Sequence, residues 1–242
     1  MRRFGLIGYP LTHSFSQKYF TEKFAQLGLG DCVYENFSVK EIGELNNILE
    51  NSDLSGLNIT IPYKKQVLDF LTDASDVVTK IGACNCINIK DGKLTGYNTD
   101  VVGFEQSLLP FLSSHHSQAL VLGTGGASAA VEFVLKKLGI PFQIVSRTVS
   151  DATISYDAID ENMISSHHLI INTTPLGMFP DIDECPEIPY QYLTAKHHLY
   201  DLIYNPAETK FLEIGRSQGT TTQNGQEMLI LQAEESWRIW NA

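Results

Sequence analysis

Residues 119–131 read Ala-Leu-Val-Leu-Gly-Thr-Gly-Gly-Ala-Ser-Ala-Ala-Val, and this stretch decides the fold. Apolar residues followed by a glycine-rich turn and a run of alanines are typical of a buried strand that passes into a helix. Gly123 lets the chain turn sharply off the strand, while Gly125 and Gly126 let backbone N–H groups approach a pyrophosphate at the helix N-terminus. Because Ser128 stands at the third glycine of G-x-G-x-x-G, an ordinary strand-to-helix turn is the alternative interpretation.

Predicted strands and helices alternate on both sides of this turn. Before it, we expect strands at 4–7, 32–37 and 57–61, helices ending at 27 and covering 41–50, 63–71, 74–80 and 99–112, and a hairpin of 84–89 with 93–97 across Asp91-Gly92. After it, we expect a helix ending at Leu138, strands at 142–145, from Ile170 and at 198–202, and a helix over 226–240. This alternation predicts two α/β domains with parallel sheets.

The overall composition is that of a globular protein, with 43% hydrophobic and 19% charged residues among 242. A formal charge of −11 argues against nucleic-acid and anionic-membrane partners, which attract clustered Lys and Arg. No apolar run has the length of a membrane span, and the apolar run after Arg3 is too short for a signal peptide. The four cysteines form no C-x-x-C pair, so we expect free thiols and a cytoplasmic location.

The histidines fall mostly in doublets, at 115–116, 167–168 and 197–198, with His13 alone. None has the i, i+4 spacing of metal ligands on a helix, so we expect no metal site. Because the doublets flank predicted strands, we expect them to be solvated strand ends.

Three short segments carry candidate site residues at predicted strand ends or helix starts. Ser14 and Ser16 open a helix, where an anion is stabilised, although Ser14 with Gln17 also fits a capping box. Lys64 follows a strand end at the edge where open α/β sheets place their sites, although most lysines are simply solvated. Asp100 opens a helix and has a cap as its alternative role.

A series of motifs extends over almost the whole chain: 5–16 (GLIGYPLTHSFS), 56–64 (GLNITIPYK), 82–85 (GACN), 96–100 (GYNTD), 172–178 (NTTPLGM), and Asn224-Gly225 with Met228-Leu229 and Gln232. In their sequence and order, these motifs resemble those of the shikimate dehydrogenase family. The resemblance implies an N-terminal substrate domain of residues 1–99 plus 226–242 and a Rossmann-type NADP-binding domain of residues 100–225. It also implies that the C-terminal helix returns to the first domain.

The activity implied by the resemblance is NADP-dependent reduction of 3-dehydroshikimate to shikimate, in aromatic amino-acid biosynthesis. Lys64 would be the proton donor and acceptor, with Asp100 bonded to it and to a substrate hydroxyl. The small-molecule substrate would be held by Ser14 and Ser16 at its carboxylate and by Thr60, Asn85, Tyr204 and Gln232 at its ring. NADP would be bound by Gly123, Gly125, Gly126, Ala127, Ser146, Arg147, Thr148 and Gly225. The oligomeric state is left open between monomer and homodimer.

The segment 146–151 bears on the choice of cofactor. No acidic residue ends the preceding strand to bind a ribose 2′-hydroxyl, and Arg147 with Thr148 is placed to meet a 2′-phosphate, which favours NADP. Ser146 often has Asn in its place in relatives. Asp151 stands where a second basic residue is usual and should reduce affinity for the phosphate.

Other departures from the family pattern are Gln17 in place of a proline, and Gln226-Glu227 in place of Leu-Gly. Two alternative functions remain open. One is a quinate/shikimate dehydrogenase that uses NAD or NADP, and the other is a non-catalytic NADP-binding sensor.

Overall fold

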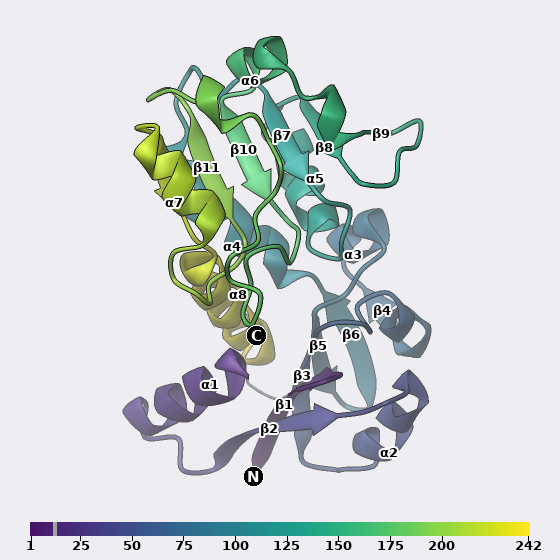
Figure 1. The fold of residues 1–242 in the computed structure, drawn as a ribbon. Coiled ribbons are helices and arrows are strands. Elements are labelled where there is room, and N and C mark those ends of the chain that lie inside the picture. The colour runs from purple at the N-terminus through teal and green to yellow at the C-terminus, as the bar shows by residue number, and fades with distance from the viewer. Residues whose placement is uncertain (12–13) are drawn as a thin grey trace. The chain divides into compact units, whose positions relative to one another are not determined.

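The computed structural model describes residues 1–11 and 14–242 (Figure 1). The predicted lone histidine, His13, lies outside the described residues. The chain forms two compact units, here called the first unit (Met1–Thr99 with Ala233–Ala242) and the second unit (Asp100–Gln232). Each unit contains one six-stranded sheet.

The sheet of the first unit is mixed, with strand order β2-β1-β3-β5-β6-β4. Its strands are β1 (Arg2–Gly8), β2 (Cys32–Ser38), β3 (Leu54–Ile59), β4 (Asp73–Ala74), β5 (Cys86–Lys90) and β6 (Lys93–Tyr97). The predicted hairpin is confirmed, and the expected parallel pairing holds for β1 with β2 and β3, whereas β5 runs antiparallel to both β3 and β6. The cause is the predicted hairpin, whose turn residues Asp91 and Gly92 have φ values of 52° and 74° and reverse the chain.

Helices cover both faces of this sheet. Helix α1 (Phe15–Gln26) and residues 233–240 pack on one face around Phe4, Phe20 and Trp240. Helices α2 (Leu45–Leu49) and α3 (Asp76–Ile81) belong to the other face. The helices predicted over 41–50 and 63–71 are shorter than expected: a 3₁₀ turn (Ile42–Glu44) precedes α2, and only Gln66–Phe70 is helical, as a 3₁₀ turn.

The sheet of the second unit is entirely parallel. Its strands are β7 (Ala119–Leu122), β8 (Phe142–Val145), β9 (Thr153–Ile154), β10 (Leu169–Asn172), β11 (His198–Asp201) and β12 (Thr221–Gln223), in the order β9-β8-β7-β10-β11-β12. Counted within this unit, the order is 3-2-1-4-5-6, that of the doubly wound dinucleotide-binding fold. The chain reverses its direction of winding between β7 and β10, and ligands of such sheets bind at the carboxyl ends of the strands at this point.

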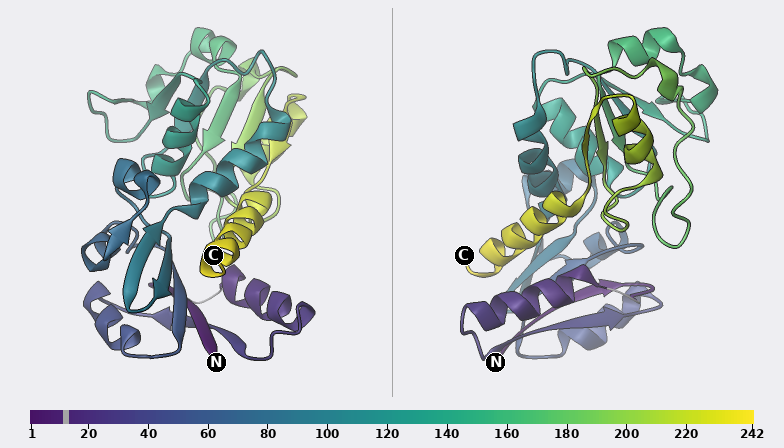
Figure 2. Two further views of the ribbon diagram at one scale, coloured as in Figure 1. Left: turned by 180° about the vertical axis from the view of Figure 1, so that it is seen from behind. Right: turned by 60° about the vertical axis from the view of Figure 1, so that its left-hand side comes forward.

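Helices lie on both faces of the second sheet (Figures 1 and 2). They are α4 (Thr99–Leu108), α5 (Ser128–Lys137), α6 (Glu161–Ser166), α7 (Lys210–Ser217) and the start of α8 (Gln226–Trp240). Tyr200 of β11 contacts Phe104 of α4, whereas its neighbour Leu199 belongs to the same core as Phe211 of α7. Successive residues of one strand thus face opposite helical layers.

The expectation that the histidine doublets are solvated is wrong for three side chains. His116, His197 and His198 are 6%, 1% and 0% exposed. They are buried because their ring nitrogens have partners: His197 Nε2 lies 3.0 Å from the Ile164 carbonyl oxygen, and His198 Nδ1 lies 2.9 Å from Thr221 Oγ1. Burial is tolerated when polar groups are hydrogen-bonded.

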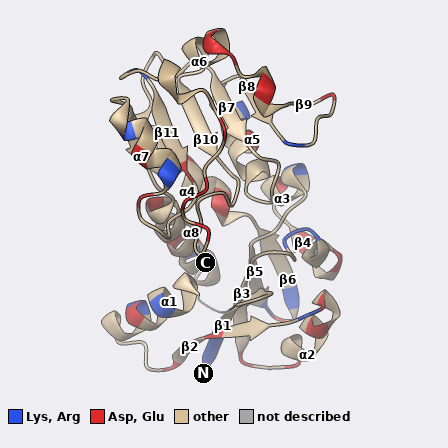
Figure 3. Cartoon of the chain, in the orientation of Figure 1, with Lys and Arg blue, Asp and Glu red and all other residues tan. Residues whose placement is uncertain are grey.

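Charged side chains of both signs alternate along the surface helices. Figure 3 shows Lys or Arg beside Asp or Glu on both α1 and α7, where Lys18 pairs with Glu22 and Lys210 with Glu213. In the described part of the chain, no helix has the length and apolar character that crossing a bilayer requires.

Candidate active site

The glycine turn lies at the carboxyl end of β7, at the reversal point of the second sheet. Gly123 has a φ of +103°, which L side chains rarely adopt. A Cβ added there would lie 2.7 Å from Thr174 Cγ2 and 3.0 Å from Thr173 Oγ1. The segment after β10 therefore borders the turn closely, and only glycine fits at position 123.

The next two glycines, at which pyrophosphate binding is predicted, have little around them. A Cβ added at Gly126 would meet no atom within 4 Å, and one added at Gly125 would meet only the Thr173 carbonyl oxygen, at 3.8 Å. Helix α5 begins directly afterwards, and its N-cap residue Ala127 makes no capping hydrogen bond with its side chain. Few atoms crowd these two positions, so a ligand could approach the backbone at the start of the helix, where anions are stabilised.

The end of β8 presents the residues expected to distinguish NADP from NAD. Ser146 is buried and accepts a hydrogen bond from the Thr148 N–H (3.2 Å), which fixes the turn. Arg147 and Asp151 are both exposed. No ion pair joins these two side chains, so Asp151 does not neutralise the Arg147 guanidinium in the described structure.

The segments after β10, β11 and β12 lie at the same carboxyl edge of the parallel sheet as the glycine turn. Asn172 Oδ1 accepts hydrogen bonds from the Thr174 N–H (3.0 Å) and hydroxyl (2.7 Å). The Gly225 N–H donates to the Ile203 carbonyl (2.9 Å), and a Cβ at Gly225 would overlap the Leu202 backbone. Tyr204, one of the predicted substrate residues, is 41% exposed in the same loop.

In the first unit, the two predicted carboxylate-binding serines lie at the start of α1. Ser14 is the N-cap, and its Oγ accepts from the Gln17 N–H at 3.2 Å. In a full capping box the Gln17 side chain would bond back to the backbone of the N-cap residue. Here Gln17 Oε1 instead accepts a hydrogen bond from Asn36 Nδ2 (2.9 Å). Ser16 is buried and hydrogen-bonds Tyr34, whose pKa burial raises well above its usual value.

A buried polar network continues from Tyr34 through the first unit. The Tyr34 hydroxyl donates to Asn58 Oδ1 (2.8 Å), and Asn58 Nδ2 donates to Ser236 Oγ (2.9 Å). The predicted ring-binding residue Asn85 accepts from the Thr99 N–H through Oδ1 (2.6 Å), at the start of α4. The structure therefore places Ser16 and Asn85 in one unit. The hydrogen bonds of Tyr34, Asn58 and Ser236 hold the buried network together, and the sequence analysis gave these three residues no role.

Lys64 lies in the turn that follows β3 and is half-buried. The Cys84 N–H donates to the Lys64 carbonyl (2.8 Å), and the Tyr63 hydroxyl donates to the Val39 carbonyl (2.7 Å). These bonds hold the backbone on either side of the lysine. Lys65, next in sequence, is exposed.

Thr60, the last predicted residue of the first unit, is half-buried, and its N–H donates to the Ile7 carbonyl (2.8 Å). Asp100 and Gln232 belong to the second unit. Asp100 is buried in the first turn of α4, where the helix dipole stabilises a carboxylate. Gln232 is 8% exposed and donates to the Leu229 carbonyl (2.9 Å). Gly103 allows α4 to approach it, since a Cβ there would lie 3.1 Å from Gln232 Cβ. The predicted site residues are thus divided between the two units, with Lys64 in the first and Asp100 in the second.

One buried residue of this region was missed by the sequence analysis. Asp201 ends β11 and is 0% exposed. Its signal in the sequence is a carboxylate at the end of a predicted strand, three residues before Tyr204. Among the residues that the structure describes, no group of three or more His, Cys, Asp or Glu side chains is arranged to hold a metal ion.

Comparisons with known proteins agree over the whole chain. A family model described as "Shikimate dehydrogenase substrate binding domain" matches residues 6–87. A relative from Clostridium beijerinckii named "Shikimate dehydrogenase (NADP(+))" is 38% identical over 250 residues, which cover 99% of this chain and 92% of the relative. Shikimate 5-dehydrogenase from Thermus thermophilus, solved in complex with NADP(H) and shikimate, is 30% identical with a TM-score of 0.87, covering 99% and 93% of the two chains. Quinate dehydrogenase from Corynebacterium glutamicum, solved with NAD, is 28% identical with a TM-score of 0.88 and covers 99% and 93%.

Proposed function

The chain belongs to the shikimate dehydrogenase family, and on that premise we propose that it catalyses the reversible, NADP-dependent reduction of 3-dehydroshikimate to shikimate. The observation that carries the proposal is the match to relatives of that name along nearly the full length of both chains. The doubly wound second sheet with its open glycine turn supports the cofactor part of the proposal.

In the proposed reaction, the cofactor supplies or accepts the hydride at the substrate carbon. The chain's own residues handle the proton and the orientation. Lys64 donates a proton from Nζ to the oxygen that becomes the hydroxyl during reduction, and it takes the proton back during oxidation. Asp100 bonds to Lys64 and to a substrate hydroxyl, which aligns both groups.

Binding of the substrate falls to neutral hydrogen-bonding groups. Ser14 and Ser16 hold the carboxylate at the N-terminus of α1, where the helix dipole adds to their hydroxyls. The ring and its hydroxyls are oriented by Thr60, Asn85, Tyr204 and Gln232. Asn85 is fixed for this role by its 2.6 Å hydrogen bond from the Thr99 N–H.

The proposed preference for NADP rests on Arg147. Its exposed guanidinium has no ion-pair partner in the described part of the chain. It can therefore form a bidentate pair with a 2′-phosphate, with Thr148 as a further donor. Gly123, Gly125, Gly126 and Ala127 receive the pyrophosphate, and Gly225 borders the nicotinamide side.

A broad-specificity quinate/shikimate dehydrogenase is the second candidate, because a quinate dehydrogenase that binds NAD has a TM-score of 0.88 to this chain. Initial rates measured for shikimate and quinate, each with NADP+ and NAD+, separate the candidates. We expect the highest kcat/KM for shikimate with NADP+. A higher kcat/KM for quinate would favour the second candidate, and cofactor binding without turnover would indicate a non-catalytic NADP sensor.

We also propose a cytoplasmic location and a monomer or homodimer. The location is supported by the four cysteines, Cys32, Cys84, Cys86 and Cys185, all of which are free thiols. Light scattering during size-exclusion chromatography distinguishes the two oligomeric states.

A further inference from the structure

Asp201 is a fully buried carboxylate whose hydrogen-bond donors are all neutral. Its Oδ1 accepts from Asn172 Nδ2 (3.1 Å) and from the Ile203 N–H (3.0 Å), and its Oδ2 accepts from the Thr209 hydroxyl (2.6 Å). In the described part of the chain, no lysine, arginine or histidine forms an ion pair with it. Its negative charge is therefore hydrogen-bonded but not compensated.

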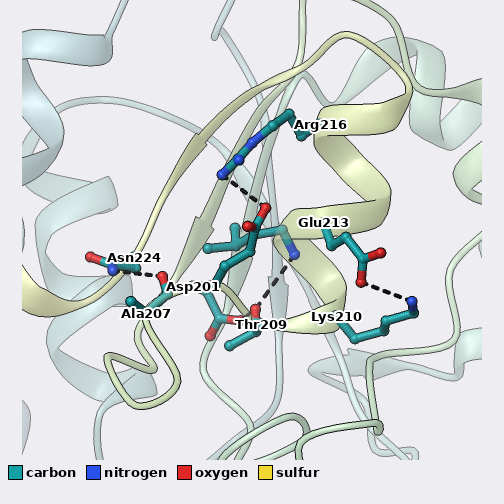
Figure 4. Close-up of polar contacts among 9 residues, drawn as sticks. Asp201, Ala207, Thr209, Lys210, Glu213, Arg216 and Asn224 are labelled. Atoms are coloured by element: carbon teal, nitrogen blue, oxygen red, sulfur yellow. Dashed lines mark hydrogen bonds and ion pairs between the residues drawn. The ribbon is translucent and has the colours of Figure 1, made fainter.

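The cations of the adjacent helix α7 are paired with other carboxylates. Lys210 Nζ lies 2.8 Å from Glu213, and an Arg216 nitrogen lies 2.9 Å from Glu208 (Figure 4). Thr209, which donates to Asp201, is also the N-cap of α7 and accepts from the Leu212 N–H (Figure 4). Lys210 and Arg216 are thus close to Asp201 in the sequence, but in the structure both form ion pairs with glutamates instead.

Keeping this carboxylate buried is costly. Burial raises the pKa of Asp201 to about 6, although hydrogen bonds from Thr209, Ile203 and Asn172 oppose the shift. An asparagine has the same shape, could accept at Oδ1 and could donate to the Thr209 hydroxyl, and would avoid the desolvation of a charge. Packing alone therefore does not account for a carboxylate at this position.

The place of Asp201 in the fold indicates what its charge faces. In a 3-2-1-4-5-6 sheet the two halves each bind one mononucleotide. The 2′-phosphate residues follow β8, so the nicotinamide half corresponds to β10, β11 and β12. Asp201 and Asn172 are the last residues of β11 and β10, at the carboxyl edge of that half.

Hydrogen bonds connect Asp201 to the segments that follow β10 and β11, on either side of the proposed nicotinamide site. Through Asn172 it holds Thr174, whose side chain packs against Gly123 of the glycine turn. Through the Ile203 N–H it holds the loop whose carbonyl accepts from the Gly225 N–H. The carboxylate is therefore fixed between the segments that border the proposed nicotinamide site.

From this arrangement we propose that Asp201 is a positioning residue whose uncompensated charge favours the oxidised, cationic nicotinamide over the neutral reduced form, an inference that rests on the proposed use of NADP. The ring gains a positive charge on oxidation, so a fixed negative charge on the nicotinamide side stabilises NADP+ selectively. Its effect is on the relative affinity of the two cofactor forms, and hence on the equilibrium between bound substrates and bound products.

The test compares the dissociation constants of NADP+ and NADPH in wild type and Asp201→Asn, by fluorescence or calorimetric titration near pH ~8, where the carboxylate is ionised. We expect the ratio Kd(NADP+)/Kd(NADPH) to rise roughly three- to tenfold in Asp201→Asn. The comparison variant is Thr209→Val, which keeps the charge of Asp201 but removes a hydrogen bond that lowers its pKa, and it should change the ratio less than Asp201→Asn does. An unchanged ratio in a folded Asp201→Asn variant overturns the inference.

A second measurement needs no substitution. Lowering the pH from ~8 to ~6 protonates part of Asp201 and should raise the same ratio in the wild type. The 2′-phosphate is common to both cofactor forms, so its titration cancels in the ratio. Tyr190, which interacts electrostatically with Asp201, has a pKa raised by burial and stays protonated. A ratio independent of pH in the wild type contradicts the inference, whereas a wild type that binds neither form refutes the proposed function itself.

Discussion

At the scale of single residues, the choice between NADP and NAD depends on a short turn after β8. Arg147 is exposed there and Asp151 follows four residues later without pairing with it. The first side chain attracts a phosphate and the second repels it, so the two substitutions should have opposite effects.

Arg147→Ala should weaken NADP+ binding about tenfold to a hundredfold, because a charge-assisted hydrogen bond contributes about 1.5–3 kcal/mol. NAD+ lacks the 2′-phosphate and should keep its affinity. Asp151→Asn is the matched variant of opposite sign and should strengthen NADP+ binding. Titration of each variant with both cofactors checks this, and equal losses for NADP+ and NAD+ in Arg147→Ala would refute the phosphate contact.

Sequence patterns predicted the positions of these residues but not their partners. Two roles were predicted for Ser14: the structure confirms the helix cap, through the Gln17 N–H, while anion binding stays a prediction. The burial of His197 and His198 escaped prediction because it depends on Ile164 and Thr221, which are distant in sequence. Asp201 was missed for the same reason, since its donors come from β10 and α7.

At the scale of elements, the glycine turn combines a backbone requirement with a requirement for space. Gly123 needs a positive φ and has no room for a Cβ, whereas Gly126 has open space around it. Substitution of Gly123 should therefore affect mainly the stability of the fold, and substitution of Gly126 mainly the binding of the cofactor.

Gly123→Ala should lower the free energy of unfolding by about 1–3 kcal/mol, because the new side chain is strained at φ +103° and meets Thr174. Gly126→Ala should leave the urea midpoint close to that of wild type but weaken NADP+ binding, since its methyl group occupies the space proposed for the pyrophosphate. Urea unfolding and cofactor titration of both variants are the measurements. Wild-type affinity in Gly126→Ala would show that the pyrophosphate binds elsewhere.

Elements with a clear apolar run or periodicity were predictable, whereas five of the short elements were missed. The strand 119–122 and the helix 226–240 match β7 and α8, because apolar runs and periodicity mark them clearly. The sequence analysis did not identify β4, β9, α6, α7 or β12. Each of these has eight residues or fewer, and the three strands have only two or three, too few for a periodic pattern.

At the scale of the whole molecule, buried titratable groups make stability depend on pH in opposite directions. Burial lowers the pKa of His198 from 6.5 to about 4, so the unfolded chain takes up its proton first as the pH falls. Stability from this residue is present above about pH 7 and is lost between about pH 6.5 and 4. The raised pKa of Asp201 has the opposite sign: its ionisation destabilises the fold as the pH rises through about 6.

His198→Gln should remove part of the acid sensitivity. Each pKa unit corresponds to about 1.4 kcal/mol, so the shift of His198 accounts for about 3 kcal/mol of stability lost on acidification. The melting temperature of wild type should therefore fall more steeply from pH ~7 to ~4.5 than that of the variant. His167→Gln, at a half-buried histidine of the same unit, is the control. If the melting temperatures of wild type and His198→Gln fell in parallel with pH, His198 would not be the source of the acid sensitivity.

The central claim is that this chain oxidises shikimate with NADP+ and that Lys64 moves the proton. The most direct measurement is the initial rate of NADPH formation from shikimate by wild type, Lys64→Ala and Lys65→Ala, with NADP+ affinity measured in parallel. We predict turnover by wild type and by Lys65→Ala, and a loss of about 10²- to 10⁴-fold in Lys64→Ala with NADP+ affinity retained. A wild type without turnover, or a Lys64→Ala variant with the wild-type rate, would contradict the account.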